Sequence, residues 1–293
     1  MIELTGYDSR FDEALKKLDK TIYLEITDHS DVFEDSICIA LVDGEFAGAG
    51  LLIAEPTFLA DRERKLPIRH IRGDFKAVPG SDYEAEVSQA LLDDMKESFA
   101  SIAADYDCGD DLYMRLWCRA GDTAYLDFLY ENGFVSLMTN NVMEYDLESG
   151  EPDADPSSRV KELLLDDPAE TEAYFRSNEG AFGVRDSEEE LRFRIRNFEG
   201  HVYALMEGNE VAASVTVWDM GDGRAATENI FCHEDYRRQG LTTRLIRAVL
   251  DRLKKDGFKK AALTCFGSNL PAMKLYRKLG YETSNVLLGM HYR

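Results

Sequence analysis

The sequence predicts an α/β protein built from two copies of one unit, and three observations support this. Strand, hairpin and helix patterns follow one another in the same order in both halves of the 293-residue chain. Short segments also match at fixed offsets between the halves. Finally, residues 148–158 contain two prolines among acidic and small polar residues, which is typical of a linker. We therefore expect domains at 1–147 and 159–293, joined by 148–158.

The matching segments cluster at the hairpins and at the ends of the two copies. Residues 204–208 (ALMEG) match 40–44 (ALVDG) at an offset of 164, and 263–265 match 116–118 at an offset of 147. Gly280, Met290 and Tyr292 fall over Gly133, Met143 and Tyr145 at that second offset. The difference predicts an insertion in the first copy, and polar residues 56–69 are the expected place.

The first copy shows the hairpin signal Asp43-Gly44 between two apolar runs. A helix follows where apolar residues recur every three or four positions. The expected helices are 8–20, 87–102 and 125–129, and the expected strands are 37–42, 46–54, 68–78, 112–118 and 134–147.

The second copy has the same order, with its hairpin turning at Glu207-Gly208. A helical stretch over 168–198 is expected to break near Gly180 and Gly183. The other expected helices begin at Leu241 and cover 271–278, and the expected strands are 160–165, 202–206, 211–218, 229–232, 260–265 and 282–292.

The net charge of −22 lies mostly in the first half. Residues 1–150 carry −19 and residues 151–293 carry −3. Such a first half repels nucleic acid and acidic membranes, so we expect neither as a partner. The second half can accept a polyanionic cofactor, because bases are dense between Arg237 and Lys260.

The remaining composition points to a cytoplasmic protein. The five cysteines, Cys38, Cys108, Cys118, Cys232 and Cys265, lack Cys-x-x-Cys spacing, so we expect reduced thiols with neither disulfides nor a metal site. No apolar run is long enough to cross a membrane, and no basic region precedes an apolar block at the N-terminus. We therefore expect no signal peptide.

The chain is organised around residues 236–243, YRRQGLTT, between a short strand and an amphipathic helix. Gly240 allows a sharp turn and a close approach of an anion. The free N–H groups of the first helical turn favour a phosphate, and Arg237 and Arg238 add full charges. Without further support, this would be an ordinary basic helix start. Neither the Walker pattern nor the dinucleotide glycine pattern is present.

The stretch resembles the pyrophosphate loop of the GNAT superfamily of acyl-CoA N-acyltransferases. That family has Arg/Gln-x-x-Gly-x-Gly/Ala, and the match here is Arg237-x-x-Gly240-x-Thr242, with Thr242 departing from the small residue. A second segment, Asn269-x-x-Ala272-x-x-Leu275-Tyr276-x-x-x-Gly280-Tyr281, resembles the family's downstream motif. The resemblance implies tandem GNAT-like domains, each a mixed, mostly antiparallel sheet flanked by helices.

The resemblance also implies which residues bind acetyl-CoA. The strand before the loop orients the thioester, the loop and first helical turn hold the pyrophosphate, and the downstream motif contacts the pantetheine arm. These residues are Ile230, Phe231, Cys232, Arg237, Arg238, Gln239, Gly240, Leu241, Thr242, Thr243, Asn269, Ala272 and Tyr276.

Two residues are candidates for catalysis. An amine attacks a thioester only when it is unprotonated, so a carboxylate base helps, and Glu228 before the cofactor loop is our candidate. A phenol can protonate the departing thiolate, and Tyr276 is our candidate acid.

Each candidate has an alternative interpretation. Tyr276 is otherwise a buried helix tyrosine, and Glu228 a solvated strand residue. His233 is an alternative base on the loop surface, whereas Cys232 is expected to be a buried strand residue because the family transfers directly. The acceptor pocket is expected to be walled by Trp218 and by aromatic residues between Tyr174 and Phe182, for which core packing is the alternative.

The first copy lacks these features. Glu84 and Glu86 occupy its phosphate position, and Asp122 and Leu129 replace Asn269 and Tyr276. We therefore expect a degenerate first copy, and one CoA per chain bound by residues 201–293.

These observations predict an enzyme that moves an acetyl group from acetyl-CoA to a primary amine of a small molecule or peptide, by direct attack. A cationic acceptor suits the acidic first half. The rival is an acyl-CoA-binding sensor or scaffold without acetyl transfer. Neither the acceptor nor the oligomeric state can be inferred from the sequence.

Overall fold

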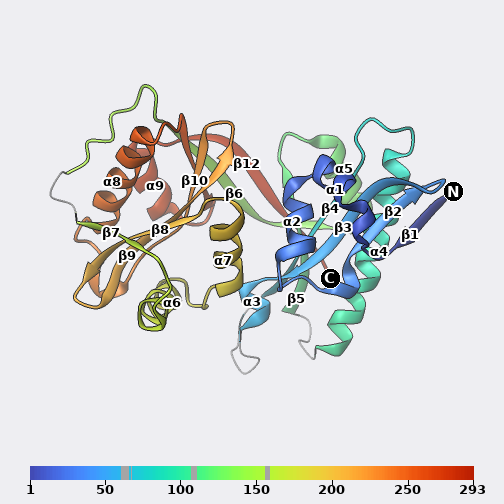
Figure 1. The fold of residues 1–293 in the computed structure, drawn as a ribbon, viewed down its shortest axis with the longest axis horizontal. Helices are drawn as coiled ribbons and strands as arrows, with labels where there is room; N and C mark the ends of the chain where they lie inside the picture. The colour runs from blue at the N-terminus through green and yellow to red at the C-terminus, as the bar shows by residue number, and fades with distance from the viewer. Residues whose placement is uncertain (61–65, 67, 107–110, 156–158) are drawn as a thin grey trace. The chain divides into compact units, whose positions relative to one another are not determined.

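The computed structural model describes residues 1–60, 66, 68–106, 111–155 and 159–293 (Figure 1). The chain forms two compact units. The first comprises Met1–Leu116 with His291–Arg293, and the second comprises Trp117–Met290. Each unit holds helices on the faces of a β-sheet, so the α/β fold class with two similar copies is confirmed.

The sheet of the first unit has the strand order β1-β2-β3-β4-β5. Its pairings are antiparallel, except that β4 and β5 are parallel. The strands are β1 (Ile2–Thr5), β2 (Cys38–Val42), β3 (Glu45–Ala54), β4 (Arg69–Ala77) and β5 (Leu112–Arg119), the last reaching into the second unit. The helices are α1 (Asp12–Leu18), α2 (Lys20–Asp28), α3 (Pro56–Leu59) and α4 (Glu84–Asp105), with 3-10 turns at Ser9–Phe11 and Glu34–Ser36.

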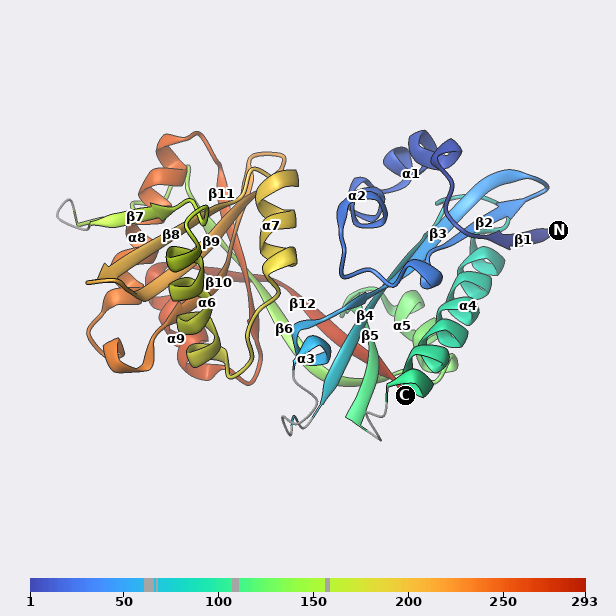
Figure 2. The same cartoon turned by 60° about the horizontal axis from the view of Figure 1, so that its bottom comes forward.

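Alternating residues of β2 pack on opposite faces of this sheet, as the period of two in a strand requires. Ile39 and Leu41 belong to the apolar cluster under α1 and α2, while Cys38 and Ala40 belong to the cluster under α4. Figure 2 shows these helices on the two sides of the sheet. The first unit is therefore a three-layered sandwich with two apolar cores.

The second unit has the strand order β12-β6-β11-β10-β9-β8-β7. Here β10 and β11 are the parallel pair. The strands are β6 (Val135–Asp146), β7 (Val160–Leu163), β8 (His201–Glu207), β9 (Glu210–Gly221), β10 (Arg224–Cys232), β11 (Lys260–Phe266) and β12 (Glu282–Tyr292). The helices are α5 (Thr123–Glu131), α6 (Pro168–Phe182), α7 (Glu188–Asn197), α8 (Leu241–Lys255) and α9 (Leu270–Leu279), with a 3-10 turn at Glu234–Tyr236.

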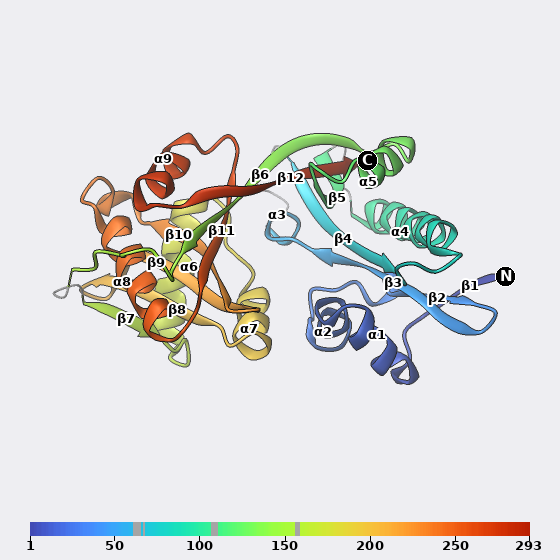
Figure 3. The ribbon, with the colours of Figure 1, turned by 90° about the horizontal axis from the view of Figure 1, so that it is seen from above.

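Helices lie on both sides of this second sheet (Figure 3). An apolar cluster lies on each face of the sheet. The larger holds the buried stripe of α8, including Leu245 and Val249, against β6, β9 and β11. The smaller holds Tyr174 and Phe175 of α6 and Leu191 of α7, together with Phe231 at the end of β10. Helices α8 and α9 cover one face of the sheet, and α6 and α7 cover the other. The site draws residues from both faces.

Strand β6 comes from the part of the sequence that resembles the first copy, but it lies in the second unit. It fills the place between β11 and β12, and it pairs with β11 from Asn140↔Phe266 to Asp146↔Lys260. Division by contacts therefore places residues 117–147 with the second unit, whereas the boundary drawn from the sequence lies at 147. Sequence order and spatial neighbours differ here because a strand pairs wherever its backbone finds a partner.

Most elements lie where the sequence predicts them, within two to four residues at their ends. The hairpin at Asp43-Gly44 is confirmed, with both residues at positive φ, as its turn type requires. The long helical stretch breaks at Gly183, which is left-handed, while Gly180 continues α6. Strand β1 and helices α2 and α3 have no counterpart in the prediction.

Three expectations fall partly outside the described residues. They concern Cys108, residues 61–65 and 67 of the expected insertion, and residues 156–158 of the expected linker. The four described cysteines are free thiols. No helix in the described part of the chain combines the length and the apolar character that crossing a bilayer requires.

Replacing Gly200 with Ala should destabilise the protein. An added Cβ would lie 2.8 Å from the Cα and 2.9 Å from the N of Ile195, which is backbone that cannot move aside without shifting the end of α7. Overpacking of this kind costs about 1–3 kcal/mol, so the melting temperature should fall by several degrees. Gly121→Ala is the matched control, because its Cβ would meet nothing within 4 Å. Equal melting temperatures for the two variants would contradict the close contact.

Candidate functional site

The site begins where two parallel strands stop pairing. β10 and β11 are in register only at Arg224↔Lys260, Ala225↔Ala261 and Ala226↔Ala262. On its other side, β10 shifts register against β9 between Glu228 and Phe231, and Asn229 within this bulge has φ 47°. A bulge bends its strand and increases the local twist. The bend therefore opens a gap between β10 and β11 beyond Ala226.

A cavity of about 180 Å³ fills this gap. Its lining comes from β6, the end of α6, β10, β11 and the start of α9. The lining residues are Asn140, Phe182, Thr227, Glu228, Asn229, Ile230, Thr264, Cys265, Phe266, Asn269 and Tyr276. Four residues predicted for the site, Glu228, Ile230, Asn269 and Tyr276, are thus brought together around one cavity.

Glu228 lies on the face that α6 and α7 cover. Thr264 of β11 donates a hydrogen bond to its carboxylate, and the charges of Arg194 and Glu190 on α7 act on it. Burial raises the pKa of Glu228 above its ordinary value, Glu190 raises it further, and Arg194 and the hydrogen bond from Thr264 lower it. A half-buried carboxylate with a raised pKa beside a cavity is a group suited to taking up a proton.

Tyr276 lies on the opposite face, in the core under α8 and α9. Its side chain is 6% exposed, and its ring is 6.0 Å from that of Tyr281. Burial raises its pKa, and Cys265 and Tyr281 add to the effect, so the phenol keeps its proton at neutral pH. The cavity therefore has a carboxylate at one face and a protonated phenol at the other.

The bulge at Asn229 is held by a polar network from the turn between α6 and α7. The Nδ2 of Asn229 donates to Oδ2 of Asp186 at 2.8 Å. Asp186 in turn donates its backbone N–H to Oδ1 of Asn178 at 3.1 Å, and Asn178 is fully buried. A non-glycine residue at positive φ costs free energy unless its surroundings hold it, and these bonds provide that support.

The predicted phosphate loop lies at the end of β10. Gly240 has φ 77° and is the N-cap of α8, without a side-chain cap for the N–H groups of the first turn. Arg238 also has positive φ, 64°. Successive backbone N–H groups in a turn with left-handed residues can point toward one place and form an anion-binding concavity. A Cβ at Gly240 would meet nothing within 4 Å, so the space in front of the loop is open.

The side chains of the loop leave its cations available. Arg237 donates from Nε to the backbone oxygen of Cys232 at 3.2 Å, and neither Arg237 nor Arg238 forms an ion pair with any residue that the structure describes. Gln239 bonds the backbone oxygen of Asp235 at 3.5 Å. Thr242 hydrogen-bonds Cys232, a half-buried thiol whose pKa is raised by burial and lowered by Thr242 and Arg237. Thr243 is half-buried in the first turn.

Other residues predicted to bind the cofactor also pack in the cores or cap helices. Leu241 and Phe231 are buried in the two cores, so only their backbone faces the site. Asn269 is the N-cap of α9, where its Oδ1 accepts from the N–H of Ala272 at 3.3 Å, which leaves its amide nitrogen for a ligand. His233 uses Nδ1 to accept from the N–H of Asp235 at 3.4 Å and caps the following turn.

The aromatic residues expected around the acceptor pocket separate into two groups. Phe182 is 54% exposed and lines the cavity. Tyr174 and Phe175 are fully buried in the core, and Trp218 lies against the guanidinium of Arg194 at 5.4 Å. The interpretation as pocket walls is therefore wrong for Tyr174 and Phe175, because their helix turns them into the sheet.

Sequence reasoning missed six lining residues: Asn140, Thr227, Asn229, Thr264, Cys265 and Phe266. Thr227 and Asn229 adjoin the predicted Glu228 in sequence, whereas Thr264, Cys265 and Phe266 come from β11. Asn140 comes from β6, far from the motifs in sequence, and only the strand order brings it to the cavity.

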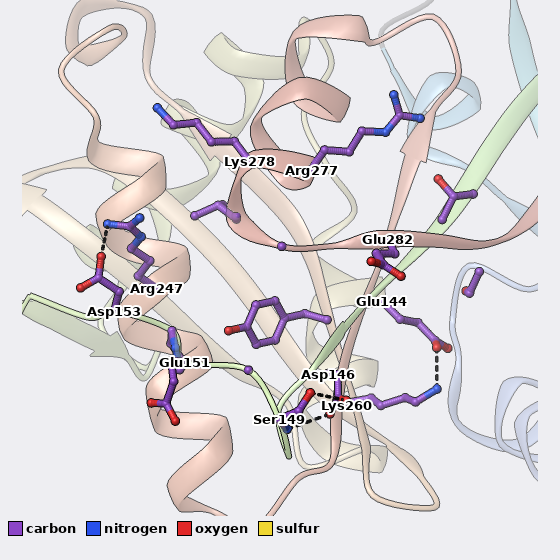
Figure 4. A pocket seen from close by; sticks show the side chains of 17 residues that line it. Glu144, Asp146, Ser149, Glu151, Asp153, Arg247, Lys260, Arg277, Lys278 and Glu282 are labelled. Atoms are coloured by element: carbon purple, nitrogen blue, oxygen red, sulfur yellow. Dashed lines mark hydrogen bonds and ion pairs between the residues drawn. The ribbon is translucent and has the colours of Figure 1, made fainter.

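A larger cavity, of about 750 Å³, lies against β6, α8, α9 and β12 (Figure 4). Its lining includes ion pairs between Lys260 and Glu144 at 2.8 Å and between Arg247 and Asp153 at 3.1 Å. Arg277 and Lys278 point in opposite directions, so they do not converge on one anion (Figure 4). None of the predicted site residues lines this cavity, so size alone does not identify the site.

The first copy differs at the matching places. α4 carries Glu84 and Glu86 in its first turn, and Glu84 accepts the N–H of Gly80 at 2.6 Å. Asp122 caps α5 as Asn269 caps α9, but Leu129 is fully buried where Tyr276 lines the cavity. The helix start that holds open N–H groups in the second unit is thus met by carboxylates in the first.

Comparisons with known proteins agree with this geometry. The profile of the acetyltransferase (GNAT) family matches residues 167–281. A GCN5-related N-acetyltransferase from Sphaerobacter thermophilus is 14% identical and has a TM-score of 0.70, with 99% of this chain and 95% of that chain covered. A tandem GNAT protein from the clavulanic acid biosynthesis pathway has the same identity and TM-score, with 100% and 98% covered.

A third similar structure is a glucosamine N-acetyltransferase region of a fungal multi-domain β-N-acetylglucosaminidase. It is 14% identical, with a TM-score of 0.63, and 100% of this chain and 38% of that one are covered. A comparison with curated protein sequences gave no match. Residues 167–281 therefore match the GNAT acetyltransferase family, and the whole chain has the fold of tandem GNAT proteins.

Proposed function

We propose that this chain transfers an acetyl group from acetyl-CoA to a primary amine of a small molecule or peptide. The observation that carries the proposal is the cavity between β10 and β11, which has Glu228 at one face, Tyr276 at the other, and the uncapped start of α8 at the end of β10. The GNAT family acts in acyl transfer generally. The donor and the acceptor class are our inference.

The residues present fit acyl-CoA in two ways. Its phosphates meet the N–H groups of α8 together with Arg237 and Arg238, where anions are favoured. The narrow pantetheine arm, which carries amide groups, fits a gap between strands whose facing backbone groups lack a strand partner beyond Ala226. Ile230 and Cys232 flank this gap on β10, and Asn269 and Ala272 flank it on α9.

The proposed reaction needs two proton movements. The amine nitrogen attacks the thioester carbon, a C–N bond forms, and the C–S bond breaks. Glu228 takes the proton that the nitrogen loses, directly or through one water, and its raised pKa makes it a stronger base than an ordinary glutamate. Tyr276 gives a proton to the departing sulfur, whose own basicity is increased by the same burial that raises the pKa of the phenol.

The acceptor is expected to be cationic in solution. The net charge of −22 attracts a positive amine over distances set by the salt concentration. Because one similar structure is named as a glucosamine N-acetyltransferase, amino sugars belong in the first acceptor panel, with alkylamines, amino alcohols, aminoglycosides and peptides. Release of free thiol from acetyl-CoA with any of them supports the proposal, while tight CoA binding without transfer to any amine supports a sensor instead.

Gly240→Glu should abolish CoA binding at a single site. Calorimetry of the wild-type protein should give one CoA per chain, because α4 of the first copy carries its own carboxylates. In the variant, a carboxylate faces the phosphates, and like charges about 4 Å apart near a surface cost roughly 4 kcal/mol, so affinity should fall at least about 100-fold.

Gly257→Glu is the matched control for this loop variant. It lies just past the other end of α8, also at positive φ and with nothing within 4 Å of an added Cβ. It bears the same backbone strain and the same added charge, and it should bind CoA normally. A stoichiometry of two, or equal affinity in both variants, would show that the phosphate site has been misplaced.

Tyr276→Phe should lower turnover with little change in CoA affinity. Loss of one general acid typically costs about 10²–10⁴-fold, and less where water substitutes. Tyr145→Phe is the control, since Tyr145 is buried in the same core but does not line the cavity. Steady-state kinetics with CoA binding measured in parallel separate the two effects. Unchanged turnover in Tyr276→Phe would make this residue a packing tyrosine.

Glu228 should titrate above the ordinary value for a glutamate, and its pKa should respond to α7. Arg194→Gln should raise it further, because it removes a positive charge that lowers the pKa of Glu228 and that also forms an ion pair with Glu190. Glu190→Gln should lower it for the converse reason. Carboxyl NMR titration, with Glu228→Gln for assignment, measures the shifts.

The acid limb of kcat/KM should move with the same sign, since the base works only when deprotonated. Glu189→Gln is the control, because Glu189 pairs with Arg196 on the same helix and is not among the groups that shift Glu228. If the NMR midpoint of Glu228 moves in the α7 variants but the acid limb of kcat/KM does not, Glu228 is not the base.

A further inference from the structure

Asn140 lies on the same face of the second sheet as Glu228. On β6, Met143 and Tyr145 belong to the core under α8, and Asn141 contacts Met273 of α9. Side chains alternate along a strand, so Asn140 points to the face covered by α6 and α7. It is paired with Phe266 of β11, whose neighbour two positions back, Thr264, hydrogen-bonds Glu228.

The side-chain oxygen of Asn140 is buried without a hydrogen-bond partner in the part of the chain that the structure describes. The residue is 8% exposed, and its Oδ1 has no hydrogen-bond donor among the residues that the structure describes. Its neighbour Asn141 differs, since its Nδ2 donates to the backbone oxygen of Cys265 at 3.3 Å and contacts Sδ of Met273 at 3.8 Å. A buried polar group left unpaired destabilises the fold, and such a group is tolerated where a ligand supplies the missing hydrogen bond.

Apolar side chains surround Asn140 in the cavity. It lines the cavity together with Glu228, Phe182 and Phe266. Phe182 and Phe266 are 54% and 46% exposed, so they offer apolar walls to a carbon skeleton. Rotation of the amide about its terminal bond presents either its oxygen or its NH₂ group to the same neighbour, since the two ends have nearly the same shape.

We propose that Asn140 is an acceptor-binding residue that recognises a hydroxyl or amide group carried by the amine substrate. The inference rests on the proposed function and narrows its substrate class to amines with such a second polar group. Two positions along a strand span about 7 Å, so this group lies a few bonds from the nitrogen that Glu228 deprotonates. A residue contributed by β6 thus selects the substrate for chemistry carried out on β10 and α9.

The test compares matched pairs of amines in wild type and in Asn140→Leu, which keeps the shape of the side chain and removes its polar atoms. The pairs are amino alcohols of three to five carbons and alkylamines in which a methyl group replaces the hydroxyl. The wild type should prefer the amino alcohol of at least one pair by about three- to tenfold in kcat/KM. Asn140→Leu should remove that preference and leave KM for acetyl-CoA unchanged.

Asn141→Leu is the control on the neighbouring position. It loses hydrogen bonds present in the folded protein, so its melting temperature should fall, but its preference for the amino alcohol should remain. Asn140→Leu should melt no lower than wild type, because it removes a group without a protein partner. Preserved preference in Asn140→Leu, or a loss of stability as large as that of Asn141→Leu, would overturn the assignment.

Calorimetry of the amines with the CoA-bound protein separates this inference from the proposed function. If no amine is acetylated, the proposed function fails, and the binding preference for amino alcohols decides the role of Asn140 alone. A preference that disappears in Asn140→Leu supports it, and equal or undetectable binding of the paired amines overturns it. If acetyl transfer occurs without a preference for amino alcohols, the proposed function is supported and the role of Asn140 is contradicted.

Discussion

The site in the second unit depends on the early end of the pairing between strands β10 and β11. β10 and β11 share only three register positions, and the bulge at Asn229 then turns β10 away. Backbone groups at the gap lose their strand partners, which a folded protein tolerates only where something else can satisfy them. The gap is open to both faces of the sheet. For that reason one small cavity can hold a carboxylate from one face and a phenol from the other.

The pKa values of the Glu228 carboxylate and the Tyr276 phenol are set by surroundings on opposite faces of the sheet. Burial raises the pKa of Glu228, and the charges of Arg194 and Glu190 on α7 shift it further in opposite directions. Tyr276 lies among apolar side chains under α8 and α9, where burial is the main cause of its raised pKa. Separate control of two proton affinities is possible because the sheet lies between the layers.

Much of this architecture could be predicted from the sequence. The hairpin at Asp43-Gly44, the stripe of α8 and the left-handed Gly240 follow from local rules that any chain obeys. The grouping of Glu228 with Tyr276 required the family resemblance, because no local rule joins residues 48 positions apart. Asn140 could not be found at all, since its place is set by the neighbours β6 acquires in the sheet, and strand order is not encoded by periodicity.

The place of β6 also bears on how such a chain can be divided. A fragment that begins after residue 158 would keep every motif of the second copy yet lack the strand between β11 and β12. Two backbone edges would then face solvent inside what should be a continuous sheet, and exposed edges recruit other chains. Any recombination, truncation or grafting that divides the chain at the linker would remove β6 from the second sheet in the same way. The two copies can be separated as sequences, but residues 159–293 alone lack one strand of their own sheet.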